Sequence, residues 1–186
     1  KSHIIQSLKL TFFSIAVFAV IYPALIFGIA QFAPAHGKVE FLEKNGHKIG
    51  AARVGQKFDA PQFFWSRPSA VNYNAAGSAG SNKGPTNPDY LKDVEKRIAD
   101  FAAAHPYLSL SEIPAEMVTA SGSGLDPDIS PQAVRIQVKR VAEFRKIDEA
   151  RLAQLVENQI EKPIFGWFGV PKVNVLRLNL ALENLN

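Results

Sequence analysis

The chain has 186 residues and a formal net charge of +4, with 21 Lys and Arg against 17 Asp and Glu. This excess is small and forms no basic run, so the composition argues against a nucleic-acid surface. The sequence contains no cysteine, which excludes disulfides, thiol catalysis and cysteine metal sites.

The amino-terminal part of the chain is an apolar stretch. No charged side chain occurs between Lys9 and Lys38, and about 20 apolar residues suffice to cross the roughly 30 Å core of a bilayer as a helix. The sequence therefore predicts a short leading segment, a transmembrane helix and one soluble domain, over residues 1–9, 10–33 and 34–186. We expect Pro23 to bend the helix, because proline removes a backbone donor.

A cleaved secretory signal peptide is the alternative for this stretch. Ala33-Pro34-Ala35 offers a small-residue cleavage site, and Lys9 lies in a basic leading region. However, the apolar run exceeds the roughly 7–15 residues typical of such signals, and it is apolar on every face, unlike a core helix. A membrane span is the favoured interpretation. Basic residues flank it on both sides, so the charge rule does not decide which side carries the domain.

The domain is predicted to begin with a β-hairpin over Val39–Gln56. Asn45-Gly46 is a strong two-residue turn signal, because both residues adopt the positive φ of a type I′ turn. We expect Phe41, Ile49 and Val54 to point toward the core.

Residues 58–88 show neither a helical nor a strand period. They contain the aromatic cluster Phe63-Phe64-Trp65 and a lone Arg67, and a segment of this length is usually functional or disordered. Disordered segments are poor in aromatic residues, which favours an ordered functional loop over a flexible linker. The glycines around Lys83 do not form a phosphate-binding loop, because Lys83 precedes Gly84 and the order of that motif is reversed.

A second unusual loop covers residues 119–131. Ser121 and Ser123 are conceivable nucleophiles, but the G-x-S-x-G pattern is not met. Asp126 and Asp128 are conceivable cation ligands, but the further oxygens of a calcium loop are missing. The favoured interpretation is a turn. The four histidines are far apart in the sequence, so metal ligation is not expected.

Helices are predicted from their caps and apolar stripes. Asn87-Pro88-Asp89, Ser130-Pro131 and Asp148 each match a helix start. The buried residues expected for the three helices are Leu91, Val94, Ile98 and Phe101; Val134, Val138, Val141 and Ala142; and Leu152, Leu155, Val156 and Ile160.

The remaining segments lack strong signals. Residues 113–118 are expected to be an extended connector, and Val173–Leu178 a strand followed by a short helix over 179–183. Phe165, Trp167 and Phe168 form a glycine-aromatic turn, for which a place in the core is favoured over a partner-facing patch. The predicted fold class is α+β: one transmembrane helix, then a single domain with a β-hairpin or small sheet and about three to four helices.

Several ordered motifs of this chain occur together in one known family. They are Phe64 with Arg67-Pro68-Ser69-Ala70, Gly80-Ser81-Asn82 with Asn87-Pro88, residues 119–126 with Ile129-Ser130-Pro131, Val138 with Arg140-Val141-Ala142, and residues 173–176 with 178–182. In these motifs, and in its proline-containing membrane helix, the chain resembles the C subunit of the bacterial Kdp-type potassium-transporting ATPase over essentially its whole length. Trp65 stands where that family often has histidine.

The resemblance implies an accessory, non-transporting subunit of a pump in the bacterial inner membrane, with no catalysis and no cofactor of its own. ATP and K⁺ would be handled by the complex, whose other members are a channel-like K⁺-translocating subunit, a P-type ATPase subunit and a small fourth subunit. Two roles follow for the C subunit: a catalytic chaperone that raises the ATP affinity of the ATPase subunit, or a cap at the outer ion entrance. The resemblance also implies a single-pass protein whose bulk lies outside the cytoplasm.

Two sets of candidate residues follow from this resemblance. Partner contacts or loop-pinning contacts are expected from Phe64, Arg67, Ser69, Asn82, Ser121, Ser123 and Asp126. Close packing of the membrane helix on a neighbour is expected at Pro23, Ala24 and Gly28, because small residues permit close helix approach. The alternative function is a membrane-tethered extracytoplasmic serine hydrolase that uses Ser121 or Ser123.

Overall fold

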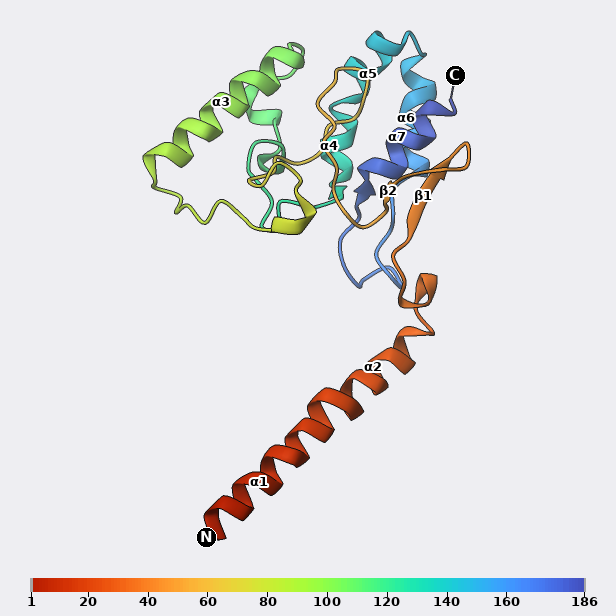
Figure 1. The fold of residues 1–186 in the computed structure, drawn as a ribbon. Coiled ribbons are helices and arrows are strands. Elements are labelled where there is room, and N and C mark those ends of the chain that lie inside the picture. The colour runs from red at the N-terminus through yellow and green to blue at the C-terminus, as the bar shows by residue number, and fades with distance from the viewer. Residues whose placement is uncertain (1, 186) are drawn as a thin grey trace. The chain divides into compact units, whose positions relative to one another are not determined.

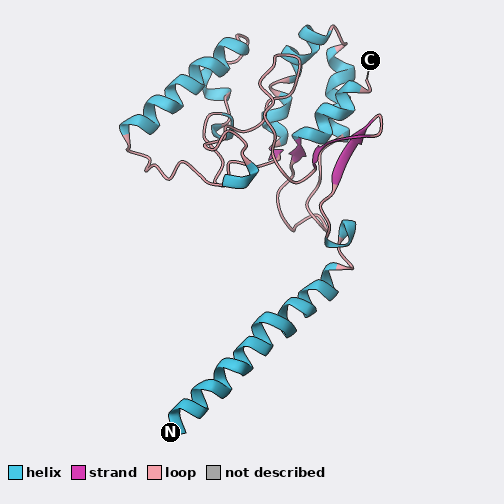
Figure 2. Ribbon diagram, in the orientation of Figure 1, coloured by secondary structure: helices cyan, strands magenta, loops and turns pink. Residues whose placement is uncertain are grey.

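A computed structural model describes residues 2–185 of the chain (Figure 1), and these divide into two compact units at residue 40. The first unit is helical, and the second is a mixed domain of helices and two small antiparallel sheets (Figure 2). The α+β class predicted from the sequence is confirmed.

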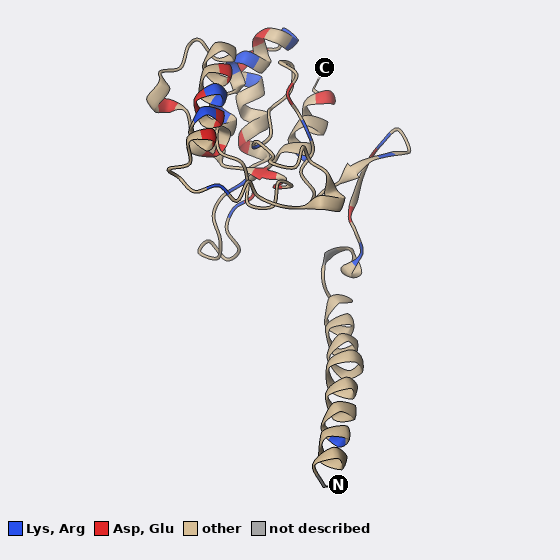
Figure 3. Ribbon diagram, turned by 60° about the vertical axis from the view of Figure 1, so that its left-hand side comes forward, with Lys and Arg blue, Asp and Glu red and all other residues tan. Residues whose placement is uncertain are grey.

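The first unit is one long apolar helix in three parts. It runs through α1 (Ser2–Ile15), the π-helical turn η1 (Ala16–Ile21) and α2 (Tyr22–Ala30), and a short 3₁₀ turn η2 (Pro34–Gly37) follows. In the described part of the chain, His3–Ala30 is the helix long and apolar enough to cross a membrane, and none of its most apolar window is buried. Charged residues are almost absent from it in Figure 3, whereas they are frequent on the domain.

The π-helical turn lies directly before Pro23. Proline has no N–H to donate to the carbonyl four residues back, and here the preceding Tyr22 N–H donates to the carbonyl of Val17, five residues back. The ladder is thus widened by one residue where the proline would otherwise leave a gap. Wide turns of this kind inside α-helices are often found at functional positions.

The predicted hairpin is confirmed as β1 (Phe41–Lys44) and β2 (His47–Ala51), which pair antiparallel. Its turn residues Asn45 and Gly46 have φ values of 53° and 77°, as a type I′ turn requires.

The predicted inward face of the hairpin is wrong, because Phe41 and Ile49 are 47% and 39% exposed. The pairing register shifts between Leu42, which pairs with Gly50, and Glu43, which pairs with Lys48, so Ile49 is the extra residue of a bulge on β2. The half-buried residues of β1 are Leu42 and Lys44, and of the three expected inward residues only Val54 is half-buried. Phe41 instead lies under the Lys48 ammonium, 4.9 Å from the ring centre.

The helices described in the domain are α3 (Pro88–Ala104), α4 (Pro131–Arg135), α5 (Val138–Arg145), α6 (Glu149–Asn158) and α7 (Val175–Glu183), with 3₁₀ turns η3 (Ala75–Gly77), η4 (Leu110–Glu112) and η5 (Ala115–Met117). Three of these helices, α3, α4 and α6, begin where their caps predict. Side chains of Asn87, Ser130 and Asp148 accept hydrogen bonds from the first-turn N–H groups of α3, α4 and α6.

Three expectations about these elements are wrong. Residues 131–145 form two helices instead of one, because the chain makes a turn at Ile136-Gln137, and residues 113–118 contain η5 instead of an extended connector. On α3 the expected stripe is buried only at Phe101, whereas Leu91 is 45% exposed. The first turns of α3 therefore extend beyond the core.

The expected strand Val173–Leu178 is also wrong. Only β4 (Val173–Asn174) is extended, paired antiparallel with β3 (Asp128–Ile129). The Asn174 side chain accepts from the Arg177 N–H and starts α7 immediately. The cap and helical spacing of Val175, Leu178 and Leu182, which are all buried, outweigh the short alternating pattern.

The core lies where α4 to α7 meet the first loop and the end of α3. Its fully buried side chains include those of Phe64, Ala133, Val134, Val141, Leu152, Val156, Val173, Leu178 and Leu182. Residues 165–168 are outside it: Phe165, Trp167 and Phe168 are 87%, 73% and 61% exposed. Their predicted place in the core is therefore wrong.

Candidate functional site: the junction of the two loops

The first loop is ordered and passes through the core at Phe64, whose side chain is fully buried. The Phe64 N–H donates to Oδ1 of Asn179 at 2.9 Å, and Nδ2 of Asn179 donates back to the Phe64 carbonyl at 3.0 Å. Asn179 belongs to α7 and is itself 2% exposed. One amide side chain thus replaces the strand partner that this buried backbone would otherwise need.

Arg140 of α5 holds the same loop from another side. Its guanidinium donates to the carbonyls of Pro61 and Phe63 and to Oε1 of Gln137, and it stacks 4.5 Å from the ring centre of Trp65. It is 2% exposed. Arginine suits this position because its planar fork offers five donors and is less strongly hydrated than an ammonium.

His105 completes the contacts of Arg140. Its Nδ1 lies 2.8 Å from the Phe101 carbonyl, and its Nε2 accepts from Nε of Arg140 at 2.9 Å. These two partners require the neutral tautomer with the proton on Nδ1. Burial, followed by the charge of Arg140, lowers the pKa of His105 from 6.5 to about 4, although the Phe101 carbonyl opposes the shift.

The two loops meet at Arg67 and Asp126, which are 59 positions apart in the sequence. Nη1 of Arg67 lies 2.9 Å from Oδ2 of Asp126, and both side chains are partly buried. The Tyr73 hydroxyl donates to the Arg67 carbonyl, and burial raises the pKa of Tyr73 to about 12. The Ser121 N–H donates to the Pro68 carbonyl at 3.1 Å. Arg67 therefore pins one loop to the other.

Ser69 and Gly124 make the closest approach between the loops. The Ser69 hydroxyl donates to the Gly124 carbonyl at 2.7 Å and accepts from the Tyr73 N–H. Gly124 has a φ of 68°, and a Cβ there would lie 2.5 Å from Val71 and 2.9 Å from the Ala79 carbonyl. Only glycine fits this position without displacing the first loop.

The remaining candidates of the second loop also serve its conformation. Ser121 is buried, and the exposed Ser123 accepts from the Leu125 N–H. Asp126 and Asp128 do not share a cation site in the described residues: Asp126 pairs with Arg67, and Asp128 pairs with Lys172. Asn82 is exposed with a φ of 53°. Their predicted partner contacts stay predictions.

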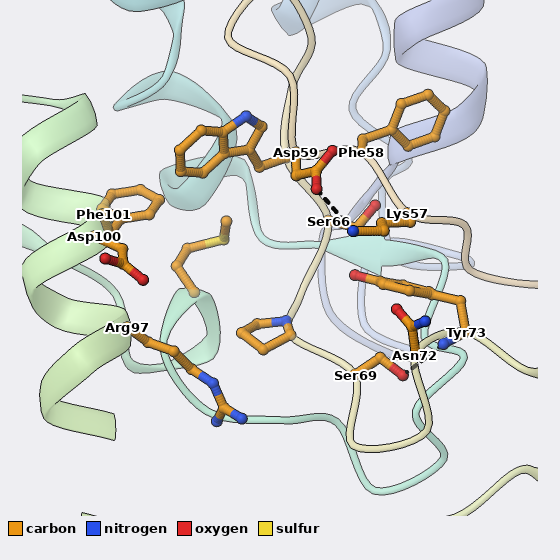
Figure 4. Close-up of a pocket in the computed structure, with 13 residues that line it drawn as sticks. Lys57, Phe58, Asp59, Ser66, Ser69, Asn72, Tyr73, Arg97, Asp100 and Phe101 are labelled. Atoms are coloured by element: carbon orange, nitrogen blue, oxygen red, sulfur yellow. Dashed lines mark hydrogen bonds and ion pairs between the residues drawn. The ribbon is translucent and has the colours of Figure 1, made fainter. Parts of the chain in front are cut away.

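A cavity of about 270 Å³ lies between the first loop and the end of α3 (Figure 4). It is lined by basic and acidic side chains and by apolar ones such as Phe101 and Met117. The lining includes Lys57, Asp59, Trp65, Tyr73, Arg97 and Asp100. Ligand pockets usually measure about 300–1,000 Å³, so the volume of this cavity lies just below the usual range.

Sequence reasoning missed the buried polar residues that hold the first loop. Arg140 occurs among the family motifs but received no role, and neither Gln137 nor His105 was assigned one. A usable signal existed: Gln137 falls on the apolar stripe of residues 134, 138 and 141, where a polar side chain needs a buried partner. The distant partners are backbone groups: the Trp65 N–H, which donates to Oε1 of Gln137 from 72 positions away, and the carbonyls of Phe63 and Pro61, which lie 77 and 79 positions from Arg140. No local pattern reveals them.

Along the apolar helix, Pro23, Ala24 and Gly28 follow the π-helical turn. A Cβ placed at Gly28 would meet nothing within 4 Å, and Ala24 is exposed. These positions are open in the first unit, so their predicted use as a packing face stays a prediction.

The structure defines a class of protein in which one apolar helix long enough to cross a membrane precedes a single α+β domain. Residues 4–184 match the family described as KdpC: K⁺-transporting ATPase, c chain. The chain belongs to this family, and is thus a subunit of a K⁺-transporting ATPase. The match includes the apolar helix, which supports a membrane span.

Relatives named potassium-transporting ATPase KdpC subunit cover nearly the same length. The chain is 59% identical over 183 residues to the one from Flavobacterium psychrophilum (98% of both chains). It is 50% identical over 185 residues to one from Bacteroides fragilis (98% and 97%), and 42% identical over 181 residues to one from Bacillus cereus (96% and 93%). These similarities give no support to the serine hydrolase alternative.

Proposed function

We propose that this chain is a non-catalytic subunit that stabilises the assembled pump, with its helix packed on the channel-like K⁺-translocating subunit and its domain at the outer mouth. The P-type ATPase subunit and a small fourth subunit complete the proposed complex. ATP and K⁺ are handled by those partners. The domain lies outside the cytoplasm, in a bacterial inner-membrane protein with one span.

One observation carries the proposal: the loop side chains that could have performed chemistry are used to fix the loops. Arg67 binds Asp126, Ser69 binds the Gly124 carbonyl, and Ser121 is buried. The loop junction is thus a rigid framework, and the apolar helix and the exposed residues Phe165, Trp167 and Phe168 are surfaces that other molecules can contact.

The chaperone role, in which the domain contacts ATP, has weaker support. The cavity of about 270 Å³ is small, and Asp59 and Asp100 in its lining would repel a triphosphate as much as Lys57 and Arg97 attract it. Isothermal calorimetry of the full chain with ATP distinguishes the two roles, since a cap gives no binding heat.

Replacing residues 10–32 by polyleucine of equal length tests the assembly role. We expect the protein to remain in the membrane, because hydrophobicity alone supports insertion. We also expect the complex to be lost, because bulky leucines replace Ala24 and Gly28 and remove the close approach. Copurification of the partner subunits and K⁺-stimulated ATPase activity are the readouts.

A matched control replaces Leu25 and Ile26 by each other, which keeps composition and volume. This variant should assemble normally. Normal copurification and normal ATPase activity of the polyleucine variant would contradict the proposal that the helix is a packing surface.

A further inference from the structure

The segment Ile164–Val170, here called the aromatic loop, is an exposed apolar tip. Ile164, Phe165, Trp167, Phe168 and Val170 are between 61% and 87% exposed. Single exposed apolar residues are ordinary, but a contiguous group of this kind marks a binding surface. We propose that the aromatic loop is a second membrane anchor, which inserts its side chains into the headgroup region of the bilayer that the helix crosses.

The aromatic loop is preformed. Glu161 and Lys172 exchange two backbone hydrogen bonds of 2.8 and 3.1 Å at its base, and Ile164 and Phe168 exchange two of 3.0 and 2.9 Å at its tip. The Lys172 ammonium lies 2.5 Å from Oδ2 of Asp128, which ties the base to β3. A rigid tip pays little conformational entropy on insertion.

The composition of the tip suits an interface between lipid and water. Tryptophan and other aromatic residues are enriched at that depth, where an apolar ring and a polar N–H both find partners. Trp167 and Phe168 lie side by side, with ring centres 4.6 Å apart. Exposed Lys162 and Arg53 near the base would meet anionic headgroups, which attract cations at about 1 kcal/mol each.

The base of the aromatic loop lies beside the point where the chain enters the domain. The chain enters the domain at Phe41, which pairs with Ala51. The carbonyl of the next residue, Ala52, accepts a hydrogen bond of 2.7 Å from Nδ2 of Asn174. Asn174 follows Lys172, at the base of the aromatic loop, by two residues. Residues 31–40 connect this point to the apolar helix, and a chain of that length reaches at most about 35 Å. This end of the domain therefore stays within about 35 Å of the end of the apolar helix.

Tethering makes a weak contact sufficient. Because the helix already holds the chain at the membrane, insertion of the aromatic loop is an intramolecular step with a high effective concentration. A loop that binds another protein would do so without a bilayer. An experiment with lipid vesicles and no other protein therefore distinguishes lipid from a protein partner. The inference depends on the membrane span, but not on the side that carries the domain or on assembly with other subunits.

The test uses spin labels, which the absence of cysteine makes straightforward. Val170→Cys places a label on the aromatic loop while Phe165, Trp167 and Phe168 remain, and Asn45→Cys places the control label at the hairpin turn. The full chain is reconstituted into vesicles of phosphatidylethanolamine and phosphatidylglycerol. Collision rates of each label with oxygen, which enriches in lipid, and with a water-soluble nickel chelate are then measured.

We expect the ratio of oxygen to nickel collisions to be severalfold higher at position 170 than at position 45. Adding Trp167→Ser and Phe168→Ser in the Val170→Cys background should bring the ratio down to the control value. These side chains are exposed, so the domain should keep its fold, which far-ultraviolet circular dichroism and an unchanged urea-unfolding midpoint verify. Equal ratios at positions 170 and 45 before those changes would overturn the proposal.

The assembled pump provides the second arm. A loop that binds a protein subunit gives a different pair of results. In the pump, the label at position 170 is then protected from both oxygen and nickel; in vesicles of the chain alone, it is as accessible as the label at position 45. This outcome would show that the membrane proposal is wrong. A high oxygen ratio in both samples supports membrane insertion.

Discussion

Arg140→Ala should destabilise the domain by about 3–5 kcal/mol, because the buried carbonyls of Pro61 and Phe63 and Nε2 of His105 lose their donor together. Each unsatisfied buried group costs about 1–3 kcal/mol, and water entering the vacated space recovers part of the sum. Urea unfolding of the full chain in detergent micelles, followed by near-ultraviolet circular dichroism, measures the change.

Two control variants separate the buried hydrogen bonds from charge alone. Arg140→Lys keeps the charge but cannot reproduce the planar fork, so we expect it to restore only part of the stability. Arg135→Ala removes an arginine whose ion pair with Glu157 is about half exposed, and it should cost at most about 1 kcal/mol. If Arg140→Ala lowered the free energy of unfolding by no more than Arg135→Ala does, the role assigned to Arg140 would be refuted.

Acidification should weaken the domain through His105. Its pKa is about 4 in the folded state against 6.5 for an exposed histidine, so between these values the unfolded chain binds more protons than the folded one. The free energy of unfolding therefore falls as the pH is lowered from about 6.5 to 4, by up to about 3 kcal/mol from this group. Above pH 7 the contribution is constant.

Carboxylates also titrate in acid, so a matched variant is required. His105→Gln has no titrating ring but keeps a donor and an acceptor. The free energy of unfolding of wild type and of this variant is measured in steps from pH 7.5 to 4.5. As the pH falls, the wild type should lose more stability than the variant, because only the wild type has the titrating ring. A pH-independent difference would show that His105 does not change its protonation on unfolding.

Local sequence signals predicted the elements whose cause is local. The turn at Asn45-Gly46 and the helix starts at Asn87, Ser130 and Asp148 depend on side chains within three residues of the backbone groups that they satisfy. The long apolar helix follows likewise from composition. These features needed no knowledge of the tertiary structure.

What failed depends on contacts between distant segments. Val173–Leu178 alternates like a strand, but Asn174 starts a helix whose apolar residues meet the core. Trp167 and Phe168 are aromatic and were assigned to the core, yet the hairpin that carries them points away from it. A sequence alone does not tell an aromatic residue that packs inside from one kept outside for a partner.

Only part of the contacts between the loops follows from the sequence. The two loops that stand out in the sequence do meet, through Arg67 and Asp126. The residues that hold the first loop in the core are Arg140, Gln137 and Asn179, whose partners are backbone atoms. Backbone partners leave no trace in residue identity, so only the structure reveals them.

The side of the membrane that carries the domain tests the account most directly, because a cap at the outer ion entrance and a chaperone that contacts ATP require opposite sides. Asn45→Cys introduces one reactive thiol at the exposed hairpin turn of a chain that has no cysteine. A membrane-impermeant maleimide should label this thiol in intact cells or spheroplasts, with no increase after permeabilisation. Labelling that appears only after permeabilisation would place the domain in the cytoplasm and contradict the proposed function.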